Sequence, residues 1–442
     1  MAKPATGNPF SPAEARAALH ALQQPALFLH MTSDWPVRDW SVDRLAVSLG
    51  DDVIRFRLGR TDETNGPLFE TQCAYIEASL AQFLRWTSGH SDADVGPFAD
   101  YPFSEYWAYA DYKYIAHLFQ EMPSKFQDVR WSDFGFEGRD GRASTLWIGS
   151  QGANTPCHLD SYGFNLVLQV QGRKRWHLFP PGDTASMYPT RIPYEESSVF
   201  SQVDVLRPDP GRFPAFTAAR PHRVTLLPGQ VLYVPRHWWH YVESLDPVTV
   251  SVNTWVELDV DDEARVGEAV TKAVVCALKA APSHDNDDTW LNPTEDEVAT
   301  HEENMQCLNL AVQACACQQT TKTKPSEAPT PIGAPFGPHL ILVPCDPCDH
   351  AVGAGGMGSG GVQNKRAKPS EPPTERPTGP YPFQARRHTE DVPEQGRAQG
   401  AGHVPITTND LLDCLVHPDV IAQVARLLLE KRRRTPHSGL AQ

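Results

Sequence analysis

Short β-rich runs that alternate with turn residues occupy the sequence from residue 107 to residue 256. Residues 164–179 consist of two such runs joined by Gln171-Gly172, which predicts a β-hairpin. A further long strand is expected over residues 248–256. Short strands at regular spacing, with turn signals between them, are typical of an all-β sandwich or barrel. We therefore predict a mainly β fold whose core covers about residues 100–258.

Helical patterns flank this β region on both sides. Ser11-Pro12-Ala13-Glu14 is a capping box with proline at the first helical position, which predicts a short helix. Residues 259–281 carry apolar side chains at helical spacing and predict a helix with one apolar face. Packing on its own domain is the simplest way to cover that face, and a homodimer contact is the alternative. Residues 1–285 are expected to form one domain.

The composition changes after this helix. Proline, glycine, serine, threonine and charged residues dominate residues 286–405, which predicts a largely disordered, low-complexity linker. A capping pattern at Thr408 and apolar residues at helical spacing predict a short terminal helix within residues 406–434. Four cysteines form only a weak zinc pattern, because Cys-x-Cys is a poor ligand spacing. They are Cys315, Cys317, Cys345 and Cys348.

The charge and the cysteine usage exclude several classes of protein. The formal net charge is -15, which argues against general nucleic-acid or anionic-membrane binding, since both need a basic surface. No apolar run is long enough to cross a bilayer, and the N-terminus lacks the apolar segment of a signal peptide. Nine cysteines at irregular spacing suit a reducing compartment better than a disulfide framework. We expect a cytoplasmic location, with nuclear entry as the alternative.

Two histidines and one aspartate in the β region have the spacing of a metal site. His158 and Asp160 are two residues apart, so on a strand both side chains point to the same face. The third ligand must come from a distant strand, where His237 and His240 compete and spacing alone does not choose between them. Two imidazoles and one carboxylate leave coordination positions open, which is the ligand set of non-haem Fe(II) oxygenases. The alternative is a core histidine beside a surface aspartate.

Lys174 indicates that an anion binds nearby. The alternation of the strand places Lys174 on an apolar face with Trp176 and Leu178. Because an unpaired buried ammonium group is costly, a dicarboxylate cosubstrate would supply the missing partner. The alternative is a lysine that extends to the mouth of the barrel. Thr155 could donate a hydrogen bond to the same carboxylate, and Asn253 could orient an iron ligand or the cosubstrate.

Several motifs together resemble the JmjC-domain (cupin-like) dioxygenases. They are Leu146-Trp-Ile-Gly149, Thr155-Pro-Cys-His-Leu-Asp160, the segment from Gln171 to Pro181, and the segment from Pro228-Gly229 to His240. The resemblance implies a double-stranded β-helix, which is a jelly roll with its metal at the open end. It also implies Fe(II) held by His158, Asp160 and His240, and so favours His240 over His237.

The same resemblance implies the cofactor contacts and the reaction. It places 2-oxoglutarate against Lys174 and Thr155, with a further hydrogen bond from Tyr109. It implies an Fe(II)- and 2-oxoglutarate-dependent hydroxylase whose substrate is a protein side chain. Motifs such as Asp410-Leu-Leu-Asp-Cys-Leu-Val416 resemble one member of the family in particular, which implies a small heat shock protein as partner and a role in stress response. A non-catalytic binding module with a retained metal site is the alternative.

Overall fold

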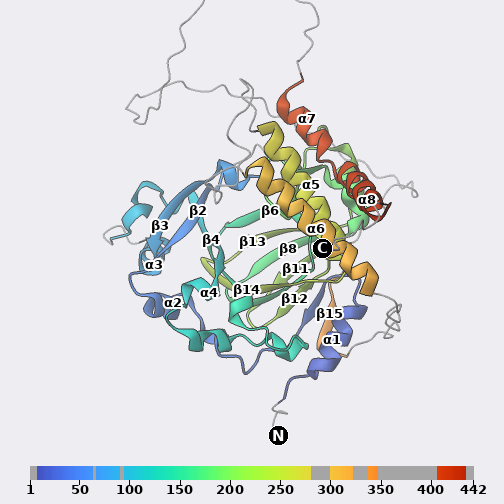
Figure 1. The fold of residues 1–442 in the computed structure, drawn as a ribbon. Coiled ribbons are helices and arrows are strands. Elements are labelled where there is room, and N and C mark those ends of the chain that lie inside the picture. Colours follow the sequence, from blue (N-terminus) through green and yellow to red (C-terminus); the bar gives the residue numbers. More distant parts are fainter. Residues whose placement is uncertain are drawn as a thin grey trace, which may run out of the picture. The chain divides into compact units, whose positions relative to one another are not determined.

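The computed structural model describes most of the chain outside the predicted linker. The described residues are 7–62, 66–89, 94–279, 299–321, 337–346 and 406–434. All of them except Ile406 belong to one unit, formed by residues 1–347 and 407–442. Figure 1 shows the strands at the centre of this unit, with α5, α6, α7 and α8 gathered at one side.

The larger of two sheets has nine strands, and every pairing in it is antiparallel. In order across the sheet they are β15 (Leu340–Leu342), β1 (Ala26–Phe28), β12 (Val231–Val234), β7 (Phe164–Gln171), β14 (Val248–Val256), β5 (Thr145–Ser150), β4 (Tyr106–Tyr114), β2 (Val53–Arg60) and β3 (Ala74–Ser79). The helices α1 (Pro12–Ala21), α2 (Val42–Leu49) and α3 (Leu80–Thr87) bury their apolar residues in the same core as this sheet. The capping box at Ser11 forms as predicted.

The smaller sheet has six antiparallel strands. In order they are β11 (His222–Leu226), β8 (Lys174–Phe179), β13 (Trp239–Ser244), β6 (Asn154–Asp160), β10 (Ser198–Ser201) and β9 (Pro189–Thr190). Strands β5 to β8, and again β11 to β14, pass between the two sheets as the chain advances. This crossing between two facing antiparallel sheets is the arrangement of a jelly roll, so the predicted mainly β fold is confirmed.

The predicted hairpin over residues 164–179 is wrong, although both of its strands exist. β7 pairs with β12 and β14 in the larger sheet, whereas β8 pairs with β11 and β13 in the smaller one. The turn therefore carries the chain from one sheet to the other. Gly172 has a φ of +64°, and a Cβ atom there would lie 2.4 Å from the carbonyl oxygen of Val248. Only glycine allows this close approach.

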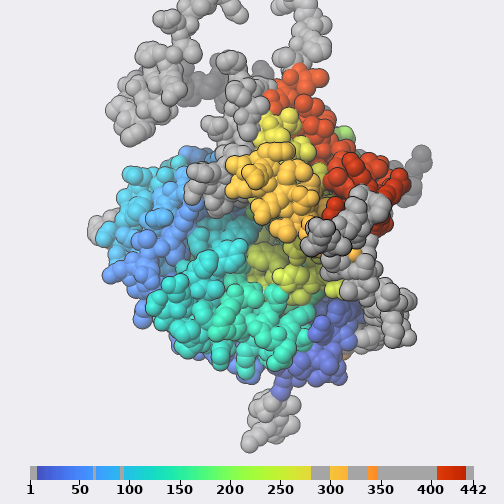
Figure 2. Space-filling view, viewed as in Figure 1, coloured from blue at the N-terminus to red at the C-terminus, as the bar shows by residue number. Residues whose placement is uncertain are grey.

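Helix α5 (Asp261–Lys279) covers its apolar face with helices of the same chain. It packs against α6 (His301–Thr321), α7 (Thr408–Leu415) and α8 (Pro418–Arg434). Val266 and Val275 of α5 are fully buried. The apolar stripe seen in the sequence is thus covered without a second subunit. Figure 2 shows α6 and α8 next to each other on the surface of this helical layer.

The prediction of disorder over residues 286–405 is wrong where the structure describes α6 and β15. The apolar residues of α6 are spread around the helix rather than gathered on one face, so periodicity did not reveal it. β15 has only three residues and owes its conformation to pairing with β1. Within the predicted linker, the structure describes residues 299–321 and 337–346. Its other residues lie outside the described part of the chain, as do the side chains of Cys317 and Cys348.

The predicted terminal helix consists of two helices, α7 and α8. Pro418 occupies the first position of α8, where its missing N–H is harmless, and it prevents α7 from continuing. Cys315 is buried in a cluster with Val266, Ala425 and Leu429. Among the described residues, no helix has the length and apolarity that crossing a membrane requires.

Candidate metal centre

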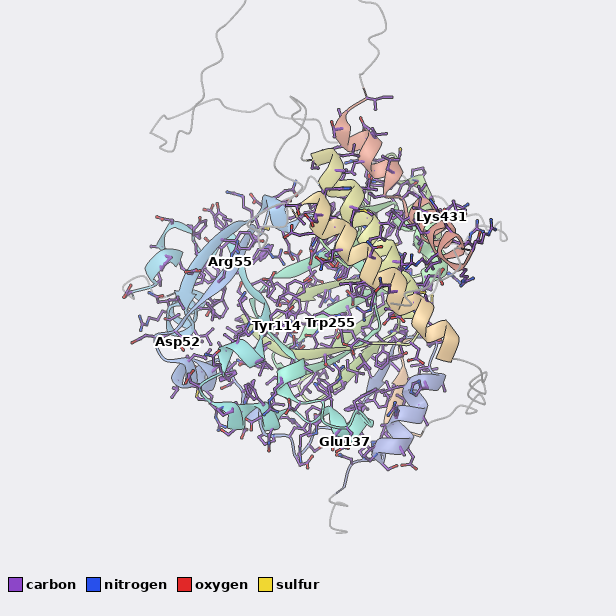
Figure 3. All side chains as sticks on the ribbon, viewed as in Figure 1. Asp52, Arg55, Tyr114, Glu137, Trp255 and Lys431 are labelled. Atoms are coloured by element: carbon purple, nitrogen blue, oxygen red, sulfur yellow. The ribbon has the colours of Figure 1, made fainter. Side chains whose placement is uncertain are left out.

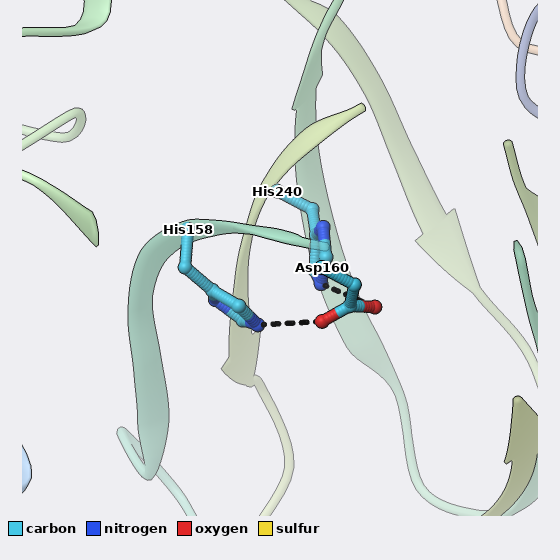
Figure 4. Close-up of side chains that lie close together, drawn as sticks. All are labelled: His158, Asp160 and His240. Carbon is cyan, nitrogen blue, oxygen red and sulfur yellow. Dashed lines mark ion pairs between the residues drawn. The ribbon is translucent and has the colours of Figure 1, made fainter. Parts of the chain in front are cut away.

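Three side chains that could bind a metal converge on one face of the smaller sheet. His158 and Asp160 lie on β6, and His240 lies opposite His158 on the neighbouring strand β13. One oxygen of Asp160 is 3.6 Å from Nε2 of His158, and the other is 4.0 Å from Nε2 of His240. One potential ligand atom of each residue lies within 4.8 Å of the others (Figure 4). The structure thus brings together the three residues that the sequence singled out.

Backbone carbonyl groups orient both imidazoles. Nδ1 of His158 is 2.9 Å from the carbonyl oxygen of Pro156, and Nδ1 of His240 is 2.9 Å from that of Trp238. Since a carbonyl can only accept, each Nδ1 carries the proton when the ring is neutral. Each Nε2 then presents its lone pair to the same point in space, which is the arrangement that metal-binding histidines require.

The charges at this site also suit a cation. Burial raises the pKa of Asp160, but the neighbouring imidazoles and Trp255 outweigh it and lower that pKa to about 2. Burial, together with the charge of His158, lowers the pKa of His240 to about 4. Burial also disfavours a proton on His158, but Asp160 outweighs it and raises the pKa of His158. At neutral pH the site therefore offers one carboxylate and at least one neutral imidazole.

Trp255 holds the carboxylate in place, a role that the sequence did not reveal. Its Nε1 donates a hydrogen bond of 3.0 Å to Oδ2 of Asp160. Figure 3 shows Trp255 among the central strands. We expect Trp255→Phe to weaken Mn(II) binding about 10- to 100-fold, the usual effect of losing a partner of a metal ligand. Calorimetric titration would measure this. Trp86→Phe, which removes an indole hydrogen bond to the carbonyl of Tyr101, should leave Mn(II) affinity unchanged.

A cavity opens beside the three residues, between the two sheets. The open space in and in front of it, including the part that reaches solvent, is about 400 Å³. Aromatic rings form much of its wall, and four residues predicted to bind the cofactor also line it. Those four are Tyr109, Thr155, Lys174 and Asn253.

Lys174 is buried in this cavity without a carboxylate partner. Its Nζ donates hydrogen bonds to the hydroxyl oxygens of Tyr109 at 3.0 Å and Ser251 at 2.8 Å. The described residues supply no acidic group within ion-pairing distance of it. Thr155 Oγ1 is also buried and has no hydrogen-bond partner among them. A buried ammonium group and an unsatisfied hydroxyl fit the carboxylate of a small ligand, because both would gain an acceptor.

The burial of Lys174 makes stability depend on pH. Burial lowers its pKa from 10.5 to about 7, so between these values the unfolded chain binds more protons than the folded one. The unfolding free energy therefore rises with pH in this window, by at most about 1.4 kcal/mol per unit. The cost of burying the charge is fully present below pH 7. In protein without metal or cosubstrate, the stability advantage of Lys174→Met over wild type should shrink from pH 7 to pH 9. Denaturant titration at both pH values checks this, and a constant difference would contradict it.

The remaining predicted residues take different positions. Asn253 accepts a hydrogen bond from Trp147 at 2.6 Å and donates one to Asn165 at 3.1 Å, so it touches none of the three metal-binding candidates. The contact with a metal-binding candidate, one of the two roles expected of Asn253, is made by Trp255, two residues further along β14. Asn253 lines the cavity, so its predicted role toward the cosubstrate stays a prediction. His237 lies outside the group, with Nε2 3.3 Å from the carbonyl of Ser161. His237 has a φ of +63° and precedes β13, so its side chain does not follow the alternating pattern of that strand.

Comparisons with known proteins agree with this geometry. Residues 12–261 match the family model described as the cupin-like domain. The chain is 53% identical over 450 residues to "HSPB1-associated protein 1 homolog" of Danio rerio. The aligned region covers 97% of this chain and 99% of that protein. It is 46% identical over 473 residues to "HSPB1-associated protein 1" of Homo sapiens, covering 96% and 94% respectively. "Lysine-specific demethylase 8" of Danio rerio is 30% identical over 241 residues, which are 53% of each chain.

Proposed function

This chain belongs to the cupin-like (JmjC) family and is a relative of the HSPB1-associated proteins, and from that premise we propose that it is an Fe(II)- and 2-oxoglutarate-dependent protein hydroxylase. The observation that carries the proposal is the convergence of His158, Asp160 and His240 beside the buried Lys174. The group of two histidines and one aspartate, taken alone, has a simpler explanation that needs no ligand, and so does the buried lysine. Together they match a site for a divalent cation and an acidic cosubstrate.

The three candidate ligands suit Fe(II) by their number and chemistry. Two imidazole nitrogens and one carboxylate would hold the ion and leave coordination positions open for other ligands. Bound iron and 2-oxoglutarate would supply the oxidising power that inserts one atom of O₂ into a C–H bond. The protein orients the two imidazoles through Pro156 and Trp238 and the carboxylate through Trp255.

Lys174, Thr155 and Tyr109 are the residues that we propose for the far carboxylate of 2-oxoglutarate. The ammonium group would attract the carboxylate by its charge, and the two hydroxyl groups would orient the carboxylate through hydrogen bonds. Lys174 starts β8 and lines the cavity, where Tyr109 and Ser251 of the facing sheet accept hydrogen bonds from its Nζ. Trp147, Trp176 and Trp255 line the same cavity and would limit the access of water to it.

The substrate that we propose is a side chain of another protein. The test uses cells that produce either the wild-type chain or His158→Ala, with mass spectrometry of the proteins that co-purify. We expect peptides that gain one oxygen atom with the wild type and lack it with the variant. Identical peptide masses in both samples, together with no iron-dependent consumption of 2-oxoglutarate by the purified protein, would refute the proposal.

We further propose that the partner is a small heat shock protein, acting in the cellular stress response. The support is that two relatives aligned over nearly their whole length are named for association with HSPB1. This association also favours a second candidate function, a non-catalytic module that binds and modulates that protein. A stoichiometric complex with HSPB1 that survives His158→Ala and Asp160→Ala, in a chain that consumes no 2-oxoglutarate, would favour the second function.

A further inference from the structure

Ser161 directly follows Asp160 in the chain, and each of its polar groups has a partner. Its backbone N–H donates to the carbonyl oxygen of Ser197 at 2.8 Å, and its hydroxyl donates to Oε1 of Glu268 at 2.8 Å. Nε2 of His237 lies further away, 3.3 Å from its carbonyl oxygen. Because Ser161 is only 6% exposed, water has little access to these groups. The position of Asp160 therefore depends on what holds Ser161.

Glu268 of α5 lies at the centre of these contacts and is itself buried. Its Oε2 accepts hydrogen bonds from Nη1 of Arg191 at 2.8 Å and from the backbone N–H of Ser197 at 2.9 Å. Its Oε1 accepts from Nη2 of Arg191 as well as from Ser161. Burial raises the pKa of Glu268, but Arg191 outweighs it and lowers that pKa. Glu268 is thus a carboxylate that binds Ser161 and Ser197 to one helix.

A second buried carboxylate lies about two turns earlier on α5. Asp261 accepts hydrogen bonds from the backbone N–H of Gly163 at 2.9 Å and from Nε of Arg236 at 3.1 Å. Gly163 comes shortly after β6, and Arg236 comes shortly before β13. These are the two strands that carry the three metal-binding candidates. The same helix therefore anchors the segments beside both strands of the metal centre.

We propose that Glu268 is a positioning residue for the metal centre, which fixes the carboxylate of Asp160 through Ser161. This role rests on the proposed function only through the metal, and it requires neither the proposed reaction nor the proposed substrate. Since α6, α7 and α8 pack on α5, the terminal helices become a structural part of the metal centre. Any displacement of α5 would therefore alter metal affinity without contact to a metal ligand.

Ser161→Ala removes the contact without leaving a buried charge unpaired. We expect it to weaken Mn(II) binding about tenfold, the lower end of the range for groups that support a metal ligand. Ser161→Thr keeps the hydroxyl group and should restore the affinity. Calorimetric titration of the metal-free, full-length chain measures both variants against wild type. The absorption spectrum of bound Co(II) should change in Ser161→Ala and recover in Ser161→Thr, because it reports the geometry of the ligands rather than the stability of the fold.

Arg191→Met combined with Glu268→Met tests the carboxylate itself. Replacing a buried ion pair by apolar residues of similar size often leaves a protein as stable as before, and thermal unfolding confirms that each variant is folded. We expect this double variant to lose at least as much Mn(II) affinity as Ser161→Ala. Adding Ser161→Ala to it should cause no further loss, because the partner of the hydroxyl is already absent.

Thr190→Val is the matched control, since it also removes a hydroxyl hydrogen bond to the helical layer. Thr190 donates to Asp413 of α7 at 2.8 Å, and its replacement should leave Mn(II) binding unchanged. Wild-type Mn(II) affinity in folded Ser161→Ala, or in the folded double variant, would overturn the role of Glu268. So would a further loss when Ser161→Ala is added to the double variant. If the wild-type chain binds no Mn(II), the metal site itself is refuted.

Discussion

Replacing His240 by alanine should weaken the binding of Mn(II), a redox-stable probe for Fe(II), by more than about 100-fold. Loss of a partner that only orients a metal ligand costs about 10- to 100-fold, and His240 is assigned as a ligand itself. The carbonyl of Trp238 holds its Nδ1, so Nε2 is the ligand atom that the substitution removes. Calorimetric titration of metal-free protein measures the affinity, and iron-dependent consumption of 2-oxoglutarate should become undetectable.

His237→Ala is the control for this experiment, since the sequence alone could not separate the two histidines. His237 contacts the carbonyl of Ser161 and lies outside the candidate metal group. Metal affinity should therefore stay within a fewfold of wild type. The ligand assignment would be wrong if His237→Ala lost the metal and His240→Ala kept it. It would also be wrong if Asp160→Ala consumed 2-oxoglutarate as fast as the wild-type protein.

Lys174→Met should weaken the binding of 2-oxoglutarate by roughly 30-fold or more while increasing the stability of the metal-free protein below pH 7. Removing one member of a buried charge pair costs about 2–5 kcal/mol of binding free energy, or roughly 30-fold or more in affinity. The stability should change in the opposite direction, because methionine has a similar length and carries no charge to desolvate. Titration of 2-oxoglutarate into the Mn(II)-loaded protein and denaturant unfolding measure the two effects.

Arg175→Met is the control that tests whether the loss of any cation from β8 would have the same effects as Lys174→Met. Arg175 follows Lys174 on β8, but it points to the exposed face and lies 3.5 Å from Glu243. Its replacement should leave 2-oxoglutarate affinity and the pH dependence of stability unchanged. If Lys174→Met binds 2-oxoglutarate normally, the cavity does not hold that carboxylate, even if metal binding is confirmed.

The sequence was sufficient for the parts of the site that depend on strand periodicity. His158 and Asp160 share a face because they are two residues apart on β6, and Lys174 is buried because it alternates with Arg175. The pairing of β6 with β13 depends on tertiary structure, so the choice of His240 needed the family resemblance. Strand pairing also explains why the predicted hairpin is wrong. The sequence of a tight turn is the same whether its two strands pair with each other or enter different sheets.

Other features had no local signal at all. Trp255 looked like one more aromatic residue of a buried strand, and its contact with Asp160 depends on how the two sheets face each other. A bulge between Ala110 and Lys113 of β4 breaks the period of two on which the strand prediction relied. Glu268 lies on α5, outside the predicted β core. Its contact with Ser161 follows from packing between distant segments, which a single sequence does not display.

The cupin-like domain depends on β15 and α6, which lie outside the family match. Shortening the chain to the matched domain therefore removes part of its packing. A fragment that stops at residue 285 would leave one edge of β1 unpaired and remove the helices that cover α5. A fragment that stops at the end of the family match, residue 261, would also leave that edge of β1 unpaired and would lose α5 itself. An open strand edge and a bare apolar helix both promote aggregation. Poor solubility of such a fragment would reflect where it was cut, and would say nothing against the activity of the intact chain.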